Sequence, residues 1–154
     1  MRGVRAAACL LAGVALVACA PAAPVAPAPS ADLVLPIAVA NGRVEVTFAR
    51  AYPLGQPARV GVRLLPSSGT LRGPLAPIIQ ASGFARTALV KRLGATPVTA
   101  TAGSSARAEL VWDTQDEDGT PVVDDDYSLV FEVEDDQGHR TSVGVTLMLR
   151  GAGR

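Results

Sequence analysis

The chain has 154 residues, of which 49% are hydrophobic and 4% aromatic, and its formal net charge is zero. This length fits one domain with accessory segments, and the hydrophobic fraction excludes a wholly disordered chain. Without residues 1–18 the chain carries 12 basic and 14 acidic residues, and a net charge of −2 argues against nucleic-acid binding through a basic surface.

Residues 1–18 have the layout of an export signal. Arg2 and Arg5 precede an apolar segment that spans residues 6–18. The uncharged run continues to Val25, so a membrane-spanning helix is an alternative, although prolines near its end disfavour it. A secretory peptide cut after Ala18 or Ala20 is a second alternative.

The four residues Leu16-Val17-Ala18-Cys19 resemble the lipobox of bacterial lipoproteins. The resemblance implies cleavage between Ala18 and Cys19, followed by a diacylglyceryl group on the sulfur of Cys19 and acylation of its new N-terminus. It also implies a cell-envelope location, and Ala20 in place of an acidic residue favours the outer membrane where there are two. Cys9 leaves with the signal, so the mature domain has no cysteine for a disulfide or a thiolate metal site.

A proline- and alanine-rich segment follows the cysteine. Residues 20–31 read APAAPVAPAPSA, with four prolines and no charge. Such a composition predicts a semi-rigid tether, and at about 3.1 Å per residue it could hold a domain roughly 35 Å from the bilayer. We therefore expect the signal in residues 1–18, the lipidated cysteine and tether in 19–31, one folded domain in 32–150 and a disordered tail in 151–154.

Short alternating runs separated by turn residues occupy the domain. We expect an edge strand with an internal proline over 33–39, a hairpin turn at Asn41-Gly42, and strands over 43–48 and 59–64. Residues 52–57 and 66–73 are predicted as loops and 74–80 as a strand. Residues 84–93 fit a strand or a short amphipathic helix, of which the strand is favoured, and 96–105 a loop or weak edge strand. Strands over 107–112, 127–134 and 141–149 complete an all-β, Ig-like β-sandwich of seven to eight antiparallel strands.

The last third of the chain carries a second resemblance. Its residues are Trp112-Asp113, Asp116-Glu117-Asp118-Gly119, Asp126-Tyr127 and Asp135-Asp136-Gln137-Gly138. This series resembles the C-terminal signature of Ig-like domains of the flagellar hook-capping type, and related lines occur in secreted bacterial Ig-like modules and in a small family of proteinase inhibitors. Thr114 and Asp126 stand where that pattern has glycines.

The aromatic residues and the glycines of this series are expected to have structural roles in the sandwich. We expect Trp112 to close the core at a strand end, with one acceptor for its indole N–H. The Tyr127 hydroxyl is expected to make a corner bond, while Gly119 and Gly138 supply dihedral angles that other residues rarely adopt.

The charges are segregated along the chain. Residues 32–107 contain nine basic and two acidic residues, whereas residues 109–136 contain twelve acidic residues and no basic one. The favoured interpretation is attraction between two halves of one domain, and the alternative is a site for a cation or partner on the acidic half. The weak candidates for calcium ligands are Asp113, Asp116, Asp118 and Asp125, although an EF-hand would need other residues at its first and last positions. No metal is favoured.

Catalytic patterns are missing from the sequence. His139 is the single histidine, so a hydrolytic triad with Ser104, Ser105 or Ser142 would depend on it, and a turn position predicts an exposed side chain. We expect a non-enzymatic, membrane-anchored envelope lipoprotein, without a cofactor, whose domain serves protein interaction or envelope structure. A calcium-dependent adhesion or proteinase-inhibitor module is the alternative, and an envelope hydrolase is a residual one.

Overall fold

A computed structural model describes residues 32–82 and 87–151, and the predicted signal, lipidated cysteine and tether lie outside them. The described residues form ten strands and no helix that could cross a membrane. The strands are β1 (Asp32–Val39), β2 (Gly42–Ala49), β3 (Ala51–Pro53), β4 (Ala58–Pro66), β5 (Thr70–Ser82), β6 (Thr87–Arg92), β7 (Val98–Thr101), β8 (Ala106–Trp112), β9 (Asp126–Asp135) and β10 (Arg140–Arg150).

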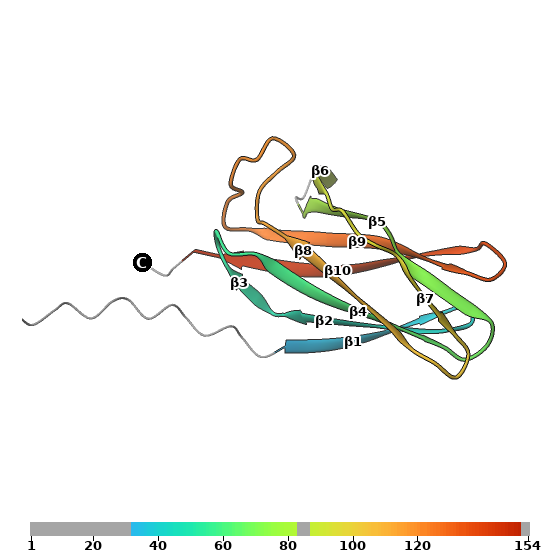
Figure 1. Ribbon diagram of the computed structural model, residues 1–154. Helices are drawn as coiled ribbons and strands as arrows, with labels where there is room; N and C mark the ends of the chain where they lie inside the picture. Colours follow the sequence, from blue (N-terminus) through green and yellow to red (C-terminus); the bar gives the residue numbers. More distant parts are fainter. Residues whose placement is uncertain (1–31, 83–86, 152–154) are drawn as a thin grey trace, which may run out of the picture.

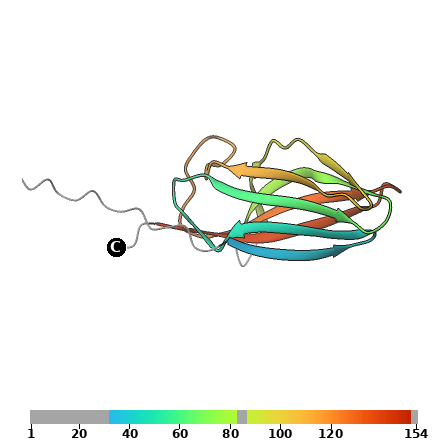
Figure 2. The same cartoon turned by 60° about the horizontal axis from the view of Figure 1, so that its bottom comes forward.

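The strands form two sheets that lie face to face (Figure 1). Sheet A has the order β1-β2-β4-β8, and sheet B has the order β3-β10-β9-β5-β6, with β7 paired to β5. Figure 2 shows the outer face of sheet A, across which β1, β2, β4 and β8 lie side by side. The order β10-β9-β5 opposite β2-β4-β8 corresponds to the two sheets of an Ig-like sandwich. The predicted Ig-like β-sandwich is confirmed, although its ten strands exceed the seven to eight expected.

Alternation in the sequence builds the core between the sheets. Side chains of a strand point alternately to its two faces, so every second residue of β2, β4, β9 and β10 is buried. The largest fully buried side chains include Trp112, Phe131 and Leu64. The inward positions predicted for these strands are confirmed: Val44, Val46, Phe48, Val60, Val62, Leu64, Tyr127, Leu129, Phe131, Val133, Val143, Val145, Leu147 and Leu149.

The chain changes sheets after β2. Arg50 separates β2 in sheet A from β3, which pairs parallel with the end of β10 in sheet B. The expectation of only antiparallel strands is therefore wrong at this point, and the loop expected over 52–57 is confirmed only for residues 54–57. The sequence signal was weak because β3 has three residues, too few for an alternating pattern.

The middle of the chain also differs from the prediction. β5 begins at Thr70, inside the predicted loop 66–73, and is interrupted by register shifts on its β9 side. These shifts break the alternation that would have marked one long strand. The expected strand over 84–93 is confirmed as β6 for residues 87–92, and the weak edge strand within 96–105 is β7.

The predicted Asn41-Gly42 turn lies one residue earlier. Val39 pairs with Gly42, so Ala40 and Asn41 are the two turn residues and Gly42 begins β2. Glycine is needed at position 42 because a Cβ atom there would lie 2.4 Å from the Leu65 carbonyl oxygen. The glycine thus permits close strand approach and does not supply a positive φ angle.

Both ends of the domain chain lie at one end of the sandwich. β1 begins and β10 ends at the left in Figure 1, where the segment between β8 and β9 also lies. β1 is the outer strand of sheet A, as predicted, and its Leu33, Val34 and Leu35 are exposed. Pro36 fits this place, because an edge strand tolerates a residue that lacks a backbone N–H.

Candidate functional site

The outer face of sheet A is hollowed along its middle. One cross-strand row joins Val34 of β1, Thr47 of β2, Gly61 of β4 and Glu109 of β8. Two hollows, of about 430 and 380 Å3, both include Thr47 and Gly61 in their walls, so they adjoin each other. We call their combined surface the sheet A hollow.

Gly61 is the reason for the depression. It is an outward-facing position of β4, between Arg59 and Arg63, and it has no side chain to cover the sheet. A Cβ atom at Gly61 would meet only Thr47, at 3.6 Å, which is ordinary contact. The hollow therefore exists because the sequence places its smallest residue at the centre of the sheet, and a larger side chain could fill it without a clash.

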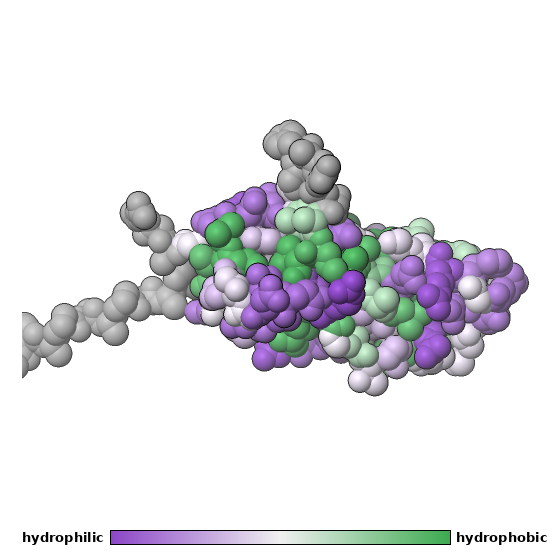
Figure 3. All heavy atoms as spheres, turned by 90° about the horizontal axis from the view of Figure 1, so that it is seen from above, coloured by the Kyte–Doolittle hydropathy of each residue, from purple (hydrophilic) through white to green (hydrophobic). Residues whose placement is uncertain are grey.

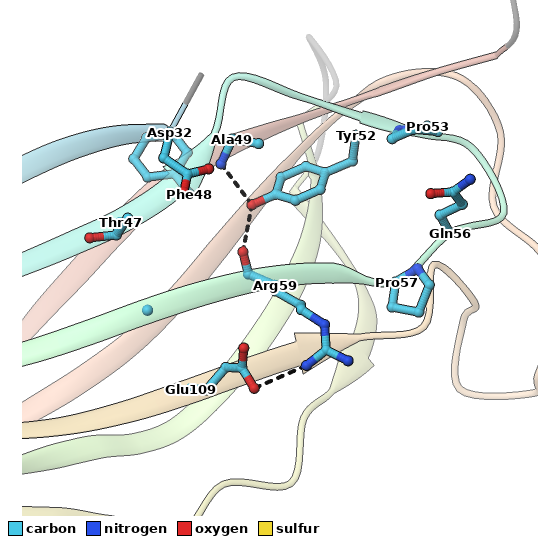
Figure 4. A pocket seen from close by; sticks show the side chains of 11 residues that line it. Asp32, Thr47, Phe48, Ala49, Tyr52, Pro53, Gln56, Pro57, Arg59 and Glu109 are labelled. Carbon is cyan, nitrogen blue, oxygen red and sulfur yellow. Dashed lines mark hydrogen bonds and ion pairs between the residues drawn. The ribbon is translucent and has the colours of Figure 1, made fainter. Parts of the chain in front are cut away.

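Tyr52 supports the end of the hollow where β1 begins. Figure 4 shows its hydroxyl between two strands: it accepts a hydrogen bond from the Ala49 N–H (3.0 Å) and donates one to the Arg59 carbonyl (2.7 Å). Burial raises the pKa of Tyr52, so the hydroxyl stays protonated and keeps donating over the physiological range. The sequence analysis missed this residue because it placed Tyr52 in a loop.

Ion pairs border the hollow. Arg59 and Glu109 are 3.1 Å apart at one side (Figure 4). Glu45 lies between two cations, 3.2 Å from Arg43 and 3.5 Å from Arg63. These charged groups are partly or largely exposed, so each pair adds little to stability, but together they surround an apolar floor with polar groups. Such a border is the usual anatomy of a protein-binding surface.

The tasks predicted for Trp112 and Tyr127 are confirmed. Trp112 is 1% exposed, and its indole N–H donates to the Gln115 carbonyl at 2.8 Å. The Tyr127 hydroxyl donates to the carbonyl of Val123, four residues earlier in the chain, at 3.0 Å. Gly119 and Gly138 have φ angles of 79° and 80°, as expected for their turns. Trp112 and Tyr127 thus fasten the segment between β8 and β9 to the core.

Thr114 occupies a position that favours glycine. It stands where the hook-capping pattern has a glycine, and its φ angle is 58°, in the left-handed region. A β-branched residue rarely adopts this conformation. Thr114 is also buried, with its hydroxyl bonded to the Asp113 carbonyl at 2.7 Å. Thr114 therefore holds a left-handed backbone conformation at a cost in backbone strain.

Three of the four candidate calcium ligands, Asp113, Asp116 and Asp125, accept hydrogen bonds from separate groups of the protein. Both carboxylate oxygens of Asp113 lie 2.8 Å from the Lys91 ammonium. Burial works to raise the pKa of Asp113, but hydrogen bonds, chiefly from Lys91, outweigh it and lower the pKa. Asp116 accepts the N–H groups of Asp118 and Thr120, and Asp125 accepts that of Asp126. Over residues 32–82 and 87–151, no three acidic, histidine or cysteine side chains are grouped to hold a metal. Calcium binding stays a prediction.

Basic and acidic residues from the two differently charged parts of the chain form ion pairs in the folded domain. Basic residues before position 108 pair with acids after it: Lys91 with Asp113, Arg92 with Glu117, Arg72 with Glu134 and Arg59 with Glu109. The distances are 2.8, 3.2, 3.9 and 3.1 Å. The interpretation as attraction between two parts of one domain is confirmed for these pairs.

His139, Ser104 and Ser105 have other contacts, and Ser142 is an exposed residue of β10. His139 is exposed in the turn between β9 and β10, where its Nδ1 lies 3.2 Å from Asp135. Ser104 donates to the Thr101 carbonyl in another turn, and Ser105 accepts a hydrogen bond from Arg63. These contacts are those of turn residues.

The fold and the hollow define an Ig-like β-sandwich module with an open sheet face. Comparison with protein-family models and with curated proteins finds no match. Among solved structures, the chain is similar to the periplasmic chaperone SfaE, with a TM-score of 0.48 and 14% identity over 71% of this chain. It spans 57% of that chaperone chain. It is also similar to murine CRIg, with a TM-score of 0.42 and 6% identity over 73% of this chain and all of the CRIg chain. These similarities concern the fold.

Proposed function

We propose that the protein is a membrane-anchored lipoprotein of the cell envelope whose Ig-like domain binds another protein and catalyses no reaction. The lipobox at Leu16-Val17-Ala18-Cys19 and the uncharged tether support the anchor. In a cell with two membranes, Ala20 after the cysteine favours the outer membrane. The observation that carries the binding role is the sheet A hollow, an open depression with an apolar floor and ion-paired borders.

The anchor is tested by replacing one cysteine at a time. Cys19→Ala should abolish incorporation of a palmitate analogue and should shift the protein from the detergent-requiring fraction to the aqueous one. Cys9→Ala is the matched control, because it changes the other cysteine, which lies in the signal, and should leave labelling intact. A Cys19→Ala protein that is still labelled and still partitions with membranes would refute the lipoprotein assignment.

The binding role is tested by filling the hollow. Gly61→Gln places a side chain in the depression, where a Cβ atom meets ordinary contact only. Gly144→Gln is the matched control on the outer face of sheet B, where a Cβ atom would lie 3.8 Å from Val130. After cross-linking in intact envelopes, Gly61→Gln should lose the partners that the unchanged protein and Gly144→Gln retain. Equal yields of cross-linked partner from all three proteins would contradict a binding role for this face.

A further inference from the structure

A second depression lies at the end of the sandwich where the domain begins and ends. It has a volume of about 390 Å3 and lies between β6, the start of β9 and the segment 113–125, which we call the acidic loop. Seen from above, hydrophobic residues lie exposed among hydrophilic ones over this part of the domain (Figure 3). This end pocket is separate from the sheet A hollow, since the two share no wall residue.

The acidic loop is held in place by bonds to sheet B. The Glu117 N–H donates to the Val90 carbonyl at 3.0 Å, and the Glu117 carboxylate accepts the Arg92 N–H at 2.8 Å. Glu117 thus occupies part of the free edge of β6 as a neighbouring strand would. Within the loop, the Val122 N–H donates to the Thr114 carbonyl at 3.1 Å. The pocket walls are therefore positioned before any partner arrives, which limits the ordering cost of binding.

The floor of the end pocket is apolar and accessible. Val123 is 68% exposed and Leu89 is 41% exposed, although both are large hydrophobic residues. Val90 and Val122 lie beside them and are packed partly against the core. Aliphatic side chains gathered in a depression with polar residues around it are typical of an interaction site.

The segment 113–126, which contributes Asp116, Glu117 and Asp118 to the pocket wall, carries a strongly negative charge. Seven acidic residues lie between positions 113 and 126, namely Asp113, Asp116, Glu117, Asp118, Asp124, Asp125 and Asp126. Lys91, Arg92 and Arg150 are the three cations paired with members of this set, which leaves a surplus of four negative charges. Of these seven acids, Asp116, Asp118 and Asp125 form no ion pair with a described residue, and Asp116 and Asp118 line the pocket. A positively charged partner would meet them without displacing a protein cation.

From this combination we propose that the end pocket binds a segment of a partner protein in which aliphatic side chains stand beside lysine or arginine. The aliphatic side chains cover Val123 and Leu89, and the cations face the unpaired carboxylates of the acidic loop. This inference rests on the proposed role in protein binding and adds the chemistry of the partner and a second surface.

A peptide titration of the full-length protein in detergent micelles tests the chemistry. The probe is a fluorescent peptide KVKLKV, compared with EVELEV, which reverses its charge, and with KSKSKS, which removes its aliphatic side chains. KVKLKV should bind about tenfold more tightly than either comparison peptide, and its affinity should fall as salt is added. If EVELEV or KSKSKS binds as well as KVKLKV, the proposal is wrong.

Single substitutions then locate the binding. Val123→Ser should weaken KVKLKV about tenfold, and Asp118→Asn should weaken it several-fold, because each removes one exposed group from the pocket. The matched controls Val111→Ser, at an exposed valine of β8, and Asp136→Asn, in the β9–β10 turn, should bind like the unchanged protein. Unaltered affinity in both pocket variants overturns the proposal.

Gly61→Gln separates this inference from the proposed function. It should leave KVKLKV binding unchanged while it removes partners of the sheet A hollow. If instead Gly61→Gln weakens KVKLKV and Val123→Ser does not, the peptide binds on sheet A; the protein-binding role then survives and the end-pocket assignment fails.

Discussion

The indole ring of Trp112 stands edge-on to the phenol ring of Tyr127, with 5.1 Å between ring centroids and 65° between ring planes. Trp112 ends β8 in sheet A, and Tyr127 lies at the start of β9 in sheet B, so this contact joins the two sheets where the acidic loop leaves and returns. Each residue also bonds to the loop backbone, through Gln115 and Val123. The pair therefore connects the core to the segment that forms the end pocket.

Removal of the corner bond should destabilise the domain modestly. Tyr127→Phe keeps the ring contact with Trp112 but leaves the Val123 carbonyl without its donor, and we expect the free energy of unfolding to fall by about 1 kcal/mol. Urea denaturation should show a lower midpoint with an unchanged m-value. A change in the m-value, or no change in the midpoint, would contradict a simple bond loss.

Thr114→Gly should stabilise the domain, because it relieves the strain of the left-handed conformation at this position. Relief of the left-handed conformation is worth about 1 kcal/mol, and the lost Thr114 hydroxyl bond is local, to the neighbouring carbonyl. We expect a midpoint shift to higher urea concentration. Thr114→Ala is the control, because it removes the same hydroxyl and leaves the strain, and it should not stabilise. Equal effects of both substitutions would show that strain at this position is negligible.

Gly42→Ala should be strongly destabilising. Its Cβ atom would lie 2.4 Å from the Leu65 carbonyl oxygen and 2.7 Å from the Pro66 Cα atom, so backbone must move. We expect a loss of about 2 kcal/mol or more in thermal or urea unfolding. Gly94→Ala is the control, since no atom lies within 4 Å of its added Cβ, and it should be nearly neutral. Similar losses for both would show that β2 and β4 separate at little cost.

The carboxylate of Asp135 makes the free energy of unfolding depend on pH. Burial tends to raise its pKa, but the N–H groups of His139 and Gln137 and the His139 ring outweigh that effect and lower it below the ordinary 3.8. A lowered folded-state pKa contributes stability above the unfolded value, and this contribution is lost as the pH falls through the folded-state pKa. The free energy of unfolding should therefore drop below about pH 4.

Asp135→Asn tests this pH dependence. The amide oxygen can still accept the two N–H groups, but it does not titrate in this range, so the variant should lose less stability between about pH 5 and pH 3 than the unchanged domain. Asp136→Asn removes the neighbouring carboxyl and is the matched control. If the two variants have the same acid dependence, Asp135 is not its source. Urea denaturation at both pH values provides the measurement.

The local sequence pattern was enough to predict where most of the strands of the sandwich lie. The alternation of apolar and polar residues alone predicts which faces of β2, β4, β9 and β10 are buried. The structural roles of Trp112 and Tyr127 could be predicted because each is an aromatic residue at the end of a strand, beside an acidic turn. The role of Tyr52 was not predicted. Its hydrogen-bond partners, Ala49 and Arg59, lie on either side of its hydroxyl only because the chain changes sheets at Arg50.

The two candidate surfaces could not be predicted in this way. Gly61 looks like any strand glycine in the sequence, and it forms a hollow only because Thr47 and Glu109 lie beside it in the paired strands. Glu117 carries no local signal for its bond to Val90, which is 27 residues away. Surface shape depends on which strands become neighbours, and that pairing is a long-range property.

The sequence by itself determined the alternation of the strands, the turn chemistry of Gly119 and Gly138, and the charge carried by each segment, because these depend on residues a few positions apart. It also contains the signal on which the proposed anchor at Cys19 rests. Only the tertiary structure decided which cation meets which acid, where the sheet is hollow and where apolar side chains stay exposed. The reason is physical: sheet pairing joins residues dozens of positions apart, and the energy of each contact exists only after the strands have met.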